Sequence, residues 1–180
     1  LCTEQIAKSI SGDKGVLEGK RTGSAGWWNT IAFDEAAEKE GLKYKNFIGD
    51  AFSFEMKDDV IKFIKEEFGG KIDLLIYSLA SAVRTDPKDG VTYRSALKST
   101  KEEIVGPSIN LEKEAMEETV MGVATPEEIH STVKVMGGED WKLWVDALDE
   151  AGVLTDGFKT VAYSYLGPKV TYGIYKDGTI

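Results

Sequence analysis

Residues 53–80, "SFEMKDDVIKFIKEEFGGKIDLLIYSLA", change from helical to strand-like hydrophobic spacing at a pair of glycines. In the first part, residues 53–68, the apolar residues recur at helical spacing. Ser53 is a suitable N-cap for this helix, and the glycines at 69–70 are suitable residues to end it. We therefore expect an amphipathic helix with one apolar face, formed by Val60, Ile61, Ile64 and Phe68.

The second part of the segment, residues 72–80, is a nearly continuous apolar run. Such runs are typical of strands that are buried on both faces of a parallel sheet. A short strand is also expected before the helix, at "LKYKNFI" (42–48). Strand, helix and strand with tight joins form a right-handed βαβ unit. The fold class that we predict is α/β, with a Rossmann-like, doubly wound, mostly parallel sheet that is incomplete in this chain.

The whole chain, residues 1–180, is predicted to form a single partial Rossmann-like domain. A turn signal at Asp89-Gly90 indicates a hairpin or lid within 86–95. Residues 99–124 show no clean period, so we expect an irregular insertion around 84–124. Further regular elements are expected as helices over 29–40, after the Thr125 cap and over 139–152, and as a strand over 158–166.

The composition excludes several classes of function. A net charge of −9 over 180 residues argues against general nucleic-acid binding, which needs a basic face. There is no apolar run long enough to span a membrane. The single cysteine, Cys2, allows no internal disulfide and fits the reducing cytoplasm. The single histidine, His130, rules out a histidine-rich metal site, and the acidic clusters are interpreted as solvated helix faces, so no metal is expected.

Ligands of an open parallel sheet bind beyond the carboxyl ends of its strands. Asp50 follows one expected strand, and its carboxylate could accept a hydrogen bond from an amino group such as that of adenine. Leu79 and Ala80 end the next strand and are small or apolar enough for backbone to approach a cofactor ring. The alternatives are that Asp50 caps the next helix and that the strand end is simply packed. No GxGxxG fingerprint is present, and Glu18 is either a ligand for an adenosine ribose or an exposed loop residue.

Tyr165 and Lys169 have the Tyr-x-x-x-Lys spacing of conventional short-chain dehydrogenases, which places both side chains on one helix face. The residues between them include Gly167 and Pro168, which should break a helix. We interpret this spacing as coincidental.

Six motifs, in order and at similar spacing, resemble the NADH-dependent trans-2-enoyl-CoA reductases and the closely related enoyl-acyl-carrier-protein reductases. The resemblance runs over most of residues 15–180. The motifs are "GSAGWWNTIAF" (23–33), "GDAFS" (49–53), "DLLIYSLAS" (73–81), "VRTDP" (83–87), "VMGGEDW" (135–141) and "AYSYLG" with "IYKDGTI" (162–180).

The resemblance implies roles for particular residues. The catalytic tyrosine of the family matches Tyr175, and a second tyrosine that contacts substrate matches Tyr165. Adenine-site residues match Asp50 and Ala51. Further cofactor residues are implied at Leu79 and Ala80, and at Glu18 as the acidic residue that favours NADH over NADPH.

The resemblance also implies the reaction, in which the 2,3-double bond of a trans-2-enoyl thioester is reduced by NADH in fatty acid metabolism. A tyrosine hydroxyl aimed at the thioester oxygen would stabilise the developing negative charge and could supply a proton. The implied partner is an enoyl-CoA or an enoyl-acyl-carrier-protein thioester, and the parent enzyme is expected to be a cytoplasmic monomer without metal, nucleic-acid or membrane partners.

In the family, a lysine follows the catalytic tyrosine in a Tyr-x8-Lys pattern, so its position here would lie beyond Ile180. The glycine-rich phosphate loop would lie before Leu1. The chain is therefore expected to be an internal fragment of a longer enzyme. Two alternatives stay open: a catalytically inactive nucleotide-binding fragment, and a conventional dehydrogenase that uses Tyr165 and Lys169.

Overall fold

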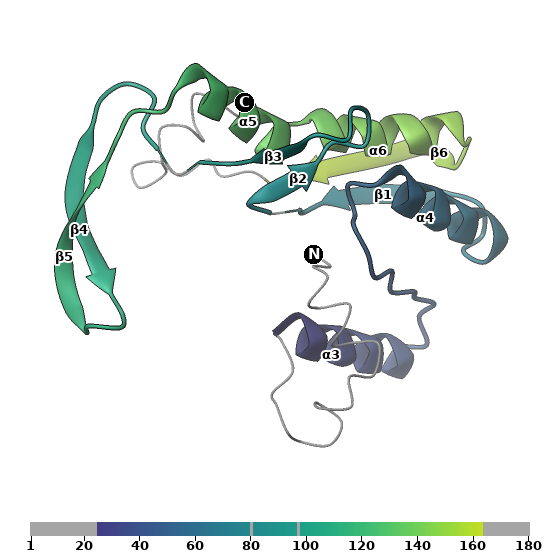
Figure 1. Ribbon diagram of the computed structural model, residues 1–180. Helices are drawn as coiled ribbons and strands as arrows, with labels where there is room; N and C mark the ends of the chain where they lie inside the picture. The colour runs from purple at the N-terminus through teal and green to yellow at the C-terminus, as the bar shows by residue number, and fades with distance from the viewer. Residues whose placement is uncertain (1–24, 80, 97, 164–180) are drawn as a thin grey trace. The chain divides into compact units, whose positions relative to one another are not determined.

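The computed structural model describes residues 25–79, 81–96 and 98–163 (Figure 1). The chain divides into two compact units. The first comprises the residues up to Ser78 together with Trp144–Val161, and the second comprises Leu79–Leu143 and the residues from Ala162 onward. The chain therefore leaves the first unit just after a strand and returns to it within a helix.

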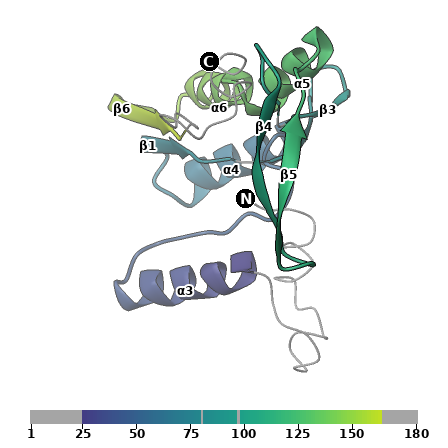
Figure 2. The same ribbon diagram turned by 90° about the vertical axis from the view of Figure 1, so that its left-hand side faces the viewer.

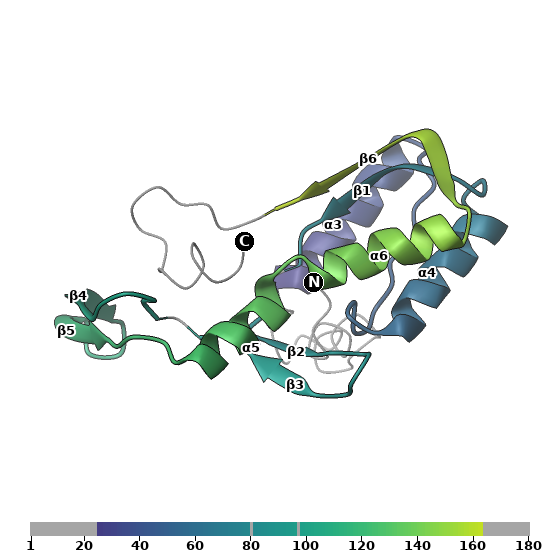
Figure 3. The ribbon, with the colours of Figure 1, turned by 90° about the horizontal axis from the view of Figure 1, so that it is seen from above.

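Strands β1 (Ile72–Tyr77) and β6 (Leu154–Ala162) form a two-stranded sheet in the first unit. The Ile72 N–H donates to the Val153 carbonyl at 2.8 Å, and the Thr155 hydroxyl donates to the Ile72 carbonyl at 3.3 Å. Because the first residues of both strands lie side by side, the strands are parallel, as their arrows show (Figure 3). The strand expected over 158–166 thus begins four residues earlier and ends at Ala162, and positions 164–166 of the expected span lie outside the described residues.

Helices α4 (Phe54–Glu66) and α6 (Glu139–Glu150) bring apolar side chains to the core of the first unit. Ile64 of α4 packs with Trp144 and Leu148 of α6 and with Val153, and Leu148 and Val153 are each 1% exposed. Burying an aliphatic side chain of this size contributes about 1.5–3 kcal/mol. Both helices were expected from their apolar faces, and the structure confirms them. The expected position of Phe68 on the apolar face of α4 is wrong, because the helix ends at Glu66 and the Phe68 side chain is 42% exposed. The partly buried residues around this cluster are Met56, Val60, Ile61, Ile72, Leu75, Tyr77, Ala151 and Leu154.

The ends of α4 are set by the residues that the sequence indicated. The Ser53 hydroxyl accepts from the Met56 N–H at 3.1 Å, which satisfies a donor that the first helical turn leaves open. At the other end, the Gly70 N–H donates to the Ile64 carbonyl at 2.8 Å. Gly69 and Gly70 have φ values of 85° and 82°, a conformation that glycine adopts without steric cost.

β1 was expected to be buried on both faces, and this expectation is wrong for the described residues. Leu75 and Tyr77 face the core, whereas Leu74 and Ile76 are 51% and 53% exposed. Side chains alternate between the two faces of a strand. Among the described residues, helices cover only one face of β1, so the apolar side chains on its other face remain exposed.

The strand expected at 42–48 is absent as well. These residues follow α3 (Ala25–Lys39) without entering a strand ladder, because no described segment pairs with them. The first βαβ unit is therefore not formed, and α6 instead leads into β6, the parallel partner of β1. The helix expected over 29–40 starts earlier, at Ala25, but ends as expected near Gly41, whose φ is 65°.

The second unit contains the expected hairpin around Asp89-Gly90. β2 (Val83–Thr85) and β3 (Thr92–Arg94) pair antiparallel, and Gly90 has a φ of 73°. Helix α5 (Pro126–Met136) lies against this hairpin. The Thr132 hydroxyl accepts from the Ala96 N–H at 3.0 Å, and the His130 ring contacts the Tyr93 ring edge-on at 5.9 Å.

Residues 99–124 are more regular than expected. β4 (Ile104–Asn110) and β5 (Ala115–Met121) form an antiparallel hairpin, drawn as a twisted ribbon in Figure 2. No apolar alternation marks these two strands, because both faces of the hairpin carry exposed side chains and Pro107 lies within β4. Its turn has no Asn-Gly signal and instead places Glu114 at a φ of 50°.

Thr125 offers a direct test of the local sequence signals. Its hydroxyl accepts from the Glu128 N–H at 3.2 Å, and the Glu128 carboxylate accepts from the Thr125 N–H at 2.9 Å. We expect Thr125→Ala to lower the free energy of unfolding by about 1 kcal/mol, measured by chemical denaturation. Thr125→Ser keeps the hydroxyl and should stay within about 0.5 kcal/mol of the wild type. Equal losses in both variants would show that the hydroxyl does not stabilise α5.

Candidate active-site region

The loop before α4 carries two of the candidate cofactor residues, Asp50 and Ala51. The Asp50 carbonyl accepts from the Ser53 N–H at 3.1 Å and from the Ser53 hydroxyl at 2.8 Å. The Asp50 carboxylate takes a different partner, since its Oδ1 accepts from the Phe52 N–H at 2.9 Å. The helix cap is therefore Ser53 and not Asp50, so the interpretation of Asp50 as a helix cap is wrong.

The Asp50 side chain has the chemistry of a ligand acceptor. It is exposed, and within the described part of the chain Oδ2 has no hydrogen-bond partner, while Oδ1 is held by the loop itself. A fixed carboxylate with one oxygen open suits an exocyclic amino group such as that of adenine. Ala51 beside it is half-buried and has a small side chain. These two residues fit a nucleotide at this position.

The other candidate residues are distributed differently. Leu79 is half-buried, lies two residues beyond the end of β1 and belongs to the second unit. Ala80 lies outside the described residues. So do Glu18, Tyr165 and Tyr175. Of the three candidates within the described residues, Asp50 and Ala51 lie together in the loop before α4.

Two residues that contact this loop were missed by the sequence analysis as site residues. Lys57 is 1% exposed, and its ammonium donates to the Phe52 carbonyl at 2.9 Å. The Trp144 indole Nε1–H donates to the Ala51 carbonyl at 3.1 Å. One signal could have revealed Lys57, because it stands three, four and seven residues before Val60, Ile61 and Ile64. A lysine on the buried face of a helix needs polar partners.

Four charged residues form an ionic cluster in the second unit: Arg84, Asp86, Lys134 and Glu139. Arg84 and Asp86 are 1% and 0% exposed and lie 3.5 Å apart. The Arg84 guanidinium donates to Glu139 at 2.8 Å and to the Lys134 carbonyl at 2.6 Å. The Lys134 ammonium lies 2.8 Å from Asp86 and 3.0 Å from Glu139. The cluster thus ties the β2–β3 hairpin to the junction of α5 and α6.

The cluster shifts the titration of its members. Burial by itself would raise the pKa of Asp86, but the hydrogen bonds from Lys134 and the Lys88 N–H, with the Arg84 charge, lower this pKa below its usual value. For Glu139, burial again opposes the hydrogen bonds from Arg84 and Lys134, and the net pKa is lowered. The hydrogen bonds to Asp86 and Glu139 raise the pKa of Lys134. The charged form of each group is therefore favoured in the folded protein.

These shifts make stability depend on pH in a defined direction. Because the carboxyl pKa values are lower in the folded state, the unfolded state binds more protons on acidification. The stabilisation by Asp86 and Glu139 is present above about pH 4, the unperturbed carboxyl value, and is lost as the pH falls through the lower folded values. We expect the free energy of unfolding to fall below about pH 4, and Glu139→Gln to flatten the profile. A wild-type profile that is level or rises on acidification would contradict this assignment.

Within residues 25–79, 81–96 and 98–163, no group of three or more histidine, cysteine, aspartate or glutamate side chains is arranged to hold a metal ion. In the same residues, the helices are too short or too polar for a bilayer span.

Comparison with known proteins identifies a matching family and similar reductases. Residues 21–180 match the family described as "Trans-2-enoyl-CoA reductase catalytic region". The chain is 56% identical over 171 residues to an enoyl-[acyl-carrier-protein] reductase [NADH] of Photobacterium profundum, covering 95% of this chain and 42% of that protein. It is 55% identical over 171 residues to a trans-2-enoyl-CoA reductase [NADH] of Clostridium beijerinckii, with the same coverage of both.

The fold agrees with that of a solved relative. The structure of a Treponema denticola trans-2-enoyl-CoA reductase in complex with NAD matches with a TM-score of 0.80 at 45% identity. The match covers 88% of this chain and 40% of that one. This confirms the predicted α/β, Rossmann-like fold class. The chain spans about two fifths of the length of the relatives that it matches.

Proposed function

Because this chain belongs to the trans-2-enoyl-CoA reductase family, we propose that the polypeptide containing it reduces the 2,3-double bond of trans-2-enoyl thioesters with NADH. The observation that carries the proposal is the identity of 55–56% to two reductases whose names specify NADH, over 95% of this chain. The names of these relatives include both carriers, coenzyme A and acyl-carrier protein. The proposed substrate is therefore an enoyl thioester of one of these two carriers.

The proposed cofactor site begins at the loop before α4. Asp50 would accept a hydrogen bond from the adenine amino group through the oxygen that the loop leaves open, and Ala51 would lie beside the ring. Leu79 and Ala80 are proposed to contact the cofactor at the next strand end, and Glu18 to accept hydrogen bonds from the adenosine ribose. When bound, the cofactor would supply the hydride. The support for the roles of Asp50, Ala51, Leu79 and Ala80 is the family motif that contains each of them and, for Asp50, its hydrogen bond to the Phe52 N–H. Glu18 lies outside these motifs, and its role rests on the wider resemblance alone.

The proposed proton donor is Tyr175, and Tyr165 is proposed to contact the substrate. As the double bond is reduced, negative charge develops on the thioester oxygen. A tyrosine hydroxyl that donates a hydrogen bond to this oxygen stabilises the charge, and the same hydroxyl is positioned to supply a proton. An unperturbed tyrosine has a pKa of about 10, so a nearby positive charge would help it to act near neutral pH.

We also propose that both units belong to one catalytic domain, with residues around 84–124 on its substrate side. The protein is proposed to act in the cytoplasm as a monomer. The single cysteine of the printed sequence is consistent with a reducing compartment. Light scattering of the purified full-length protein and fractionation of its native cells test the last two proposals.

The decisive experiment measures NADH oxidation by the full-length polypeptide with crotonyl-CoA and with crotonyl-acyl-carrier protein. Turnover with either thioester supports the proposal, and the ratio of the two kcat/KM values identifies the carrier. Absence of turnover with both, in a folded protein, would overturn it. The isolated 180-residue chain is assayed beside it for NADH binding. Binding without turnover in both polypeptides would favour the alternative, an inactive nucleotide-binding protein.

A further inference from the structure

We propose that Lys57 and Trp144 are positioning residues, which preset the Asp50 carboxylate for the cofactor by holding the Ala51–Phe52 peptide in one orientation. This inference rests on the proposed NADH site at Asp50 and Ala51. Lys57 and Trp144 come from different helices, α4 and α6, and both belong to the first unit. Their common target is the backbone of the loop.

The Ala51 carbonyl receives hydrogen bonds from both side chains. The Trp144 Nε1–H donates to it at 3.1 Å, and the Lys57 ammonium donates to it at 3.3 Å. The same ammonium reaches the Phe52 carbonyl at 2.9 Å and the Ser53 carbonyl at 3.4 Å. The ammonium also lies 5.0 Å from the centre of the Trp144 ring, within range of a cation–π interaction. The buried Lys57 ammonium thus donates to three successive carbonyls, those of Ala51, Phe52 and Ser53.

The opposite side of the same peptide is bound by Asp50. A trans peptide is planar, so its C=O and N–H point in opposite directions and rotate together. In the Ala51–Phe52 peptide, the C=O is held by Lys57 and Trp144, and the N–H donates to Asp50 Oδ1 at 2.9 Å. Fixing the carbonyl therefore fixes the N–H, which in turn orients the carboxylate. The two buried side chains act on the ligand site through one rigid peptide plane.

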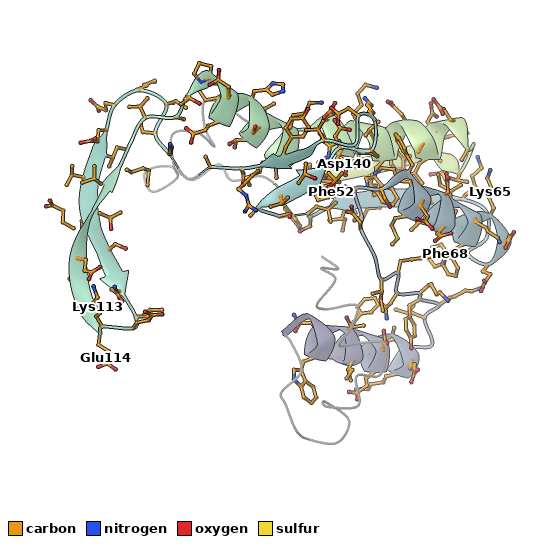
Figure 4. The ribbon with its side chains drawn as sticks, viewed as in Figure 1. Phe52, Lys65, Phe68, Lys113, Glu114 and Asp140 are labelled. Carbon is orange, nitrogen blue, oxygen red and sulfur yellow. The ribbon has the colours of Figure 1, made fainter. Side chains whose placement is uncertain are left out.

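The residue types support this role over simple core filling. Lys57 is 1% exposed, and a buried charge is costly unless polar groups surround it. A methionine would fill similar space without that cost. An ammonium has three donors and no acceptor, which suits a set of converging carbonyls. Lys65 of the same helix is instead exposed, and Figure 4 labels it near the end of α4 that is farther from the loop residue Phe52.

The main test measures the Kd for NADH in the full-length protein. Trp144→Phe keeps an aromatic ring in the core but removes the Nε1–H donor, and we expect NADH binding to weaken about two- to tenfold. Lys57→Met removes the charged donors and should weaken binding about tenfold or more. At saturating NADH, kcat and the KM for crotonyl-CoA should change less than about twofold. Lys65→Met, on the exposed side of α4, is the matched control and should leave the Kd unchanged.

A double-mutant cycle separates positioning from general destabilisation. If Trp144 acts through Asp50, adding Trp144→Phe to Asp50→Ala should have little further effect on the Kd. Independent structural damage would instead multiply the two effects. A full additional loss in the double variant would overturn the inference.

A measurement on the unmodified protein covers the case in which variants fail to fold. In the absence of NADH, the Phe52 amide should be protected from hydrogen exchange, since the loop is already set. Exchange at the unprotected rate would overturn the inference. A wild type that neither binds NADH nor oxidises it with thioesters would instead contradict the proposed function. Variants with wild-type NADH affinity, in an active enzyme, would contradict only the positioning role.

Discussion

In the full-length polypeptide, Tyr175→Phe should lower kcat/KM for crotonyl-CoA by about 10²–10³ and leave the Kd for NADH unchanged. The substitution removes only the hydroxyl that is proposed to donate to the thioester oxygen. This interaction strengthens as negative charge develops, so its loss affects the transition state more than the bound ground state. The measurement is the initial rate of NADH oxidation across thioester concentrations, together with an NADH titration of each protein.

Two other tyrosines make the test specific. Tyr163 is 68% exposed, and Tyr163→Phe should leave both kinetic constants near their wild-type values. Tyr165→Phe separates the competing assignment, in which Tyr165 and Lys169 act as in a conventional short-chain dehydrogenase. If Tyr165→Phe abolishes turnover while Tyr175→Phe does not, that assignment is correct and the one proposed here is wrong.

The parts of the fold that follow from local chemistry were predictable. Ser53 and Thr125 cap their helices through contacts with residues three positions away. Gly41 and Gly70 mark helix ends through a backbone conformation that other residues rarely adopt. The Asp89-Gly90 turn likewise predicted the β2–β3 hairpin from adjacent residues. Each of these signals is contained within one or two turns of chain.

The parts that depend on distant pairing were not predictable in the same way. Residues 42–48 have the composition of a strand, but a strand forms only where a partner offers its hydrogen bonds. The β4–β5 hairpin shows the opposite case, in which strands form although the sequence did not predict them. Its seven cross-strand pairs form without a regular apolar alternation. In β1, the apolar run correctly indicated a strand, yet only one face is covered within the described residues.

In the candidate site, too, residues with a local sequence signal could be predicted and residues that act through distant contacts could not. Asp50 was identified from its place after an expected strand and from a family motif, although that strand is not formed in the described residues. Trp144 was interpreted as core only, because its contact with the Ala51 carbonyl joins residues 93 positions apart. Lys57 was overlooked although its position on an apolar helix face indicated a buried charge. The Trp144 contact requires the packing of α6 near the loop before α4, which no local pattern contains.

The second large effect concerns stability. We expect Asp86→Ala to lower the free energy of unfolding by about 3–5 kcal/mol, measured by urea denaturation near neutral pH. The four members of the ionic cluster carry two positive and two negative charges, and Asp86 is 0% exposed. Removing its carboxylate leaves Arg84 and Lys134 with one counter-charge, Glu139. A buried positive charge is then left without compensation, which costs more than the lost hydrogen bonds alone.

A second substitution tests that explanation directly. If the cost of Asp86→Ala comes from excess positive charge, then Arg84→Met in the same protein should recover part of the lost stability, because Lys134 and Glu139 again balance. If the cost comes only from lost packing, the double variant should be less stable than either single one. Glu103→Ala, an exposed acidic residue of the same unit, is the control and should change stability by less than about 0.5 kcal/mol. A loss below about 1 kcal/mol for Asp86→Ala would mean that water or a rearranged side chain compensates Arg84, and that the cluster does not anchor the hairpin.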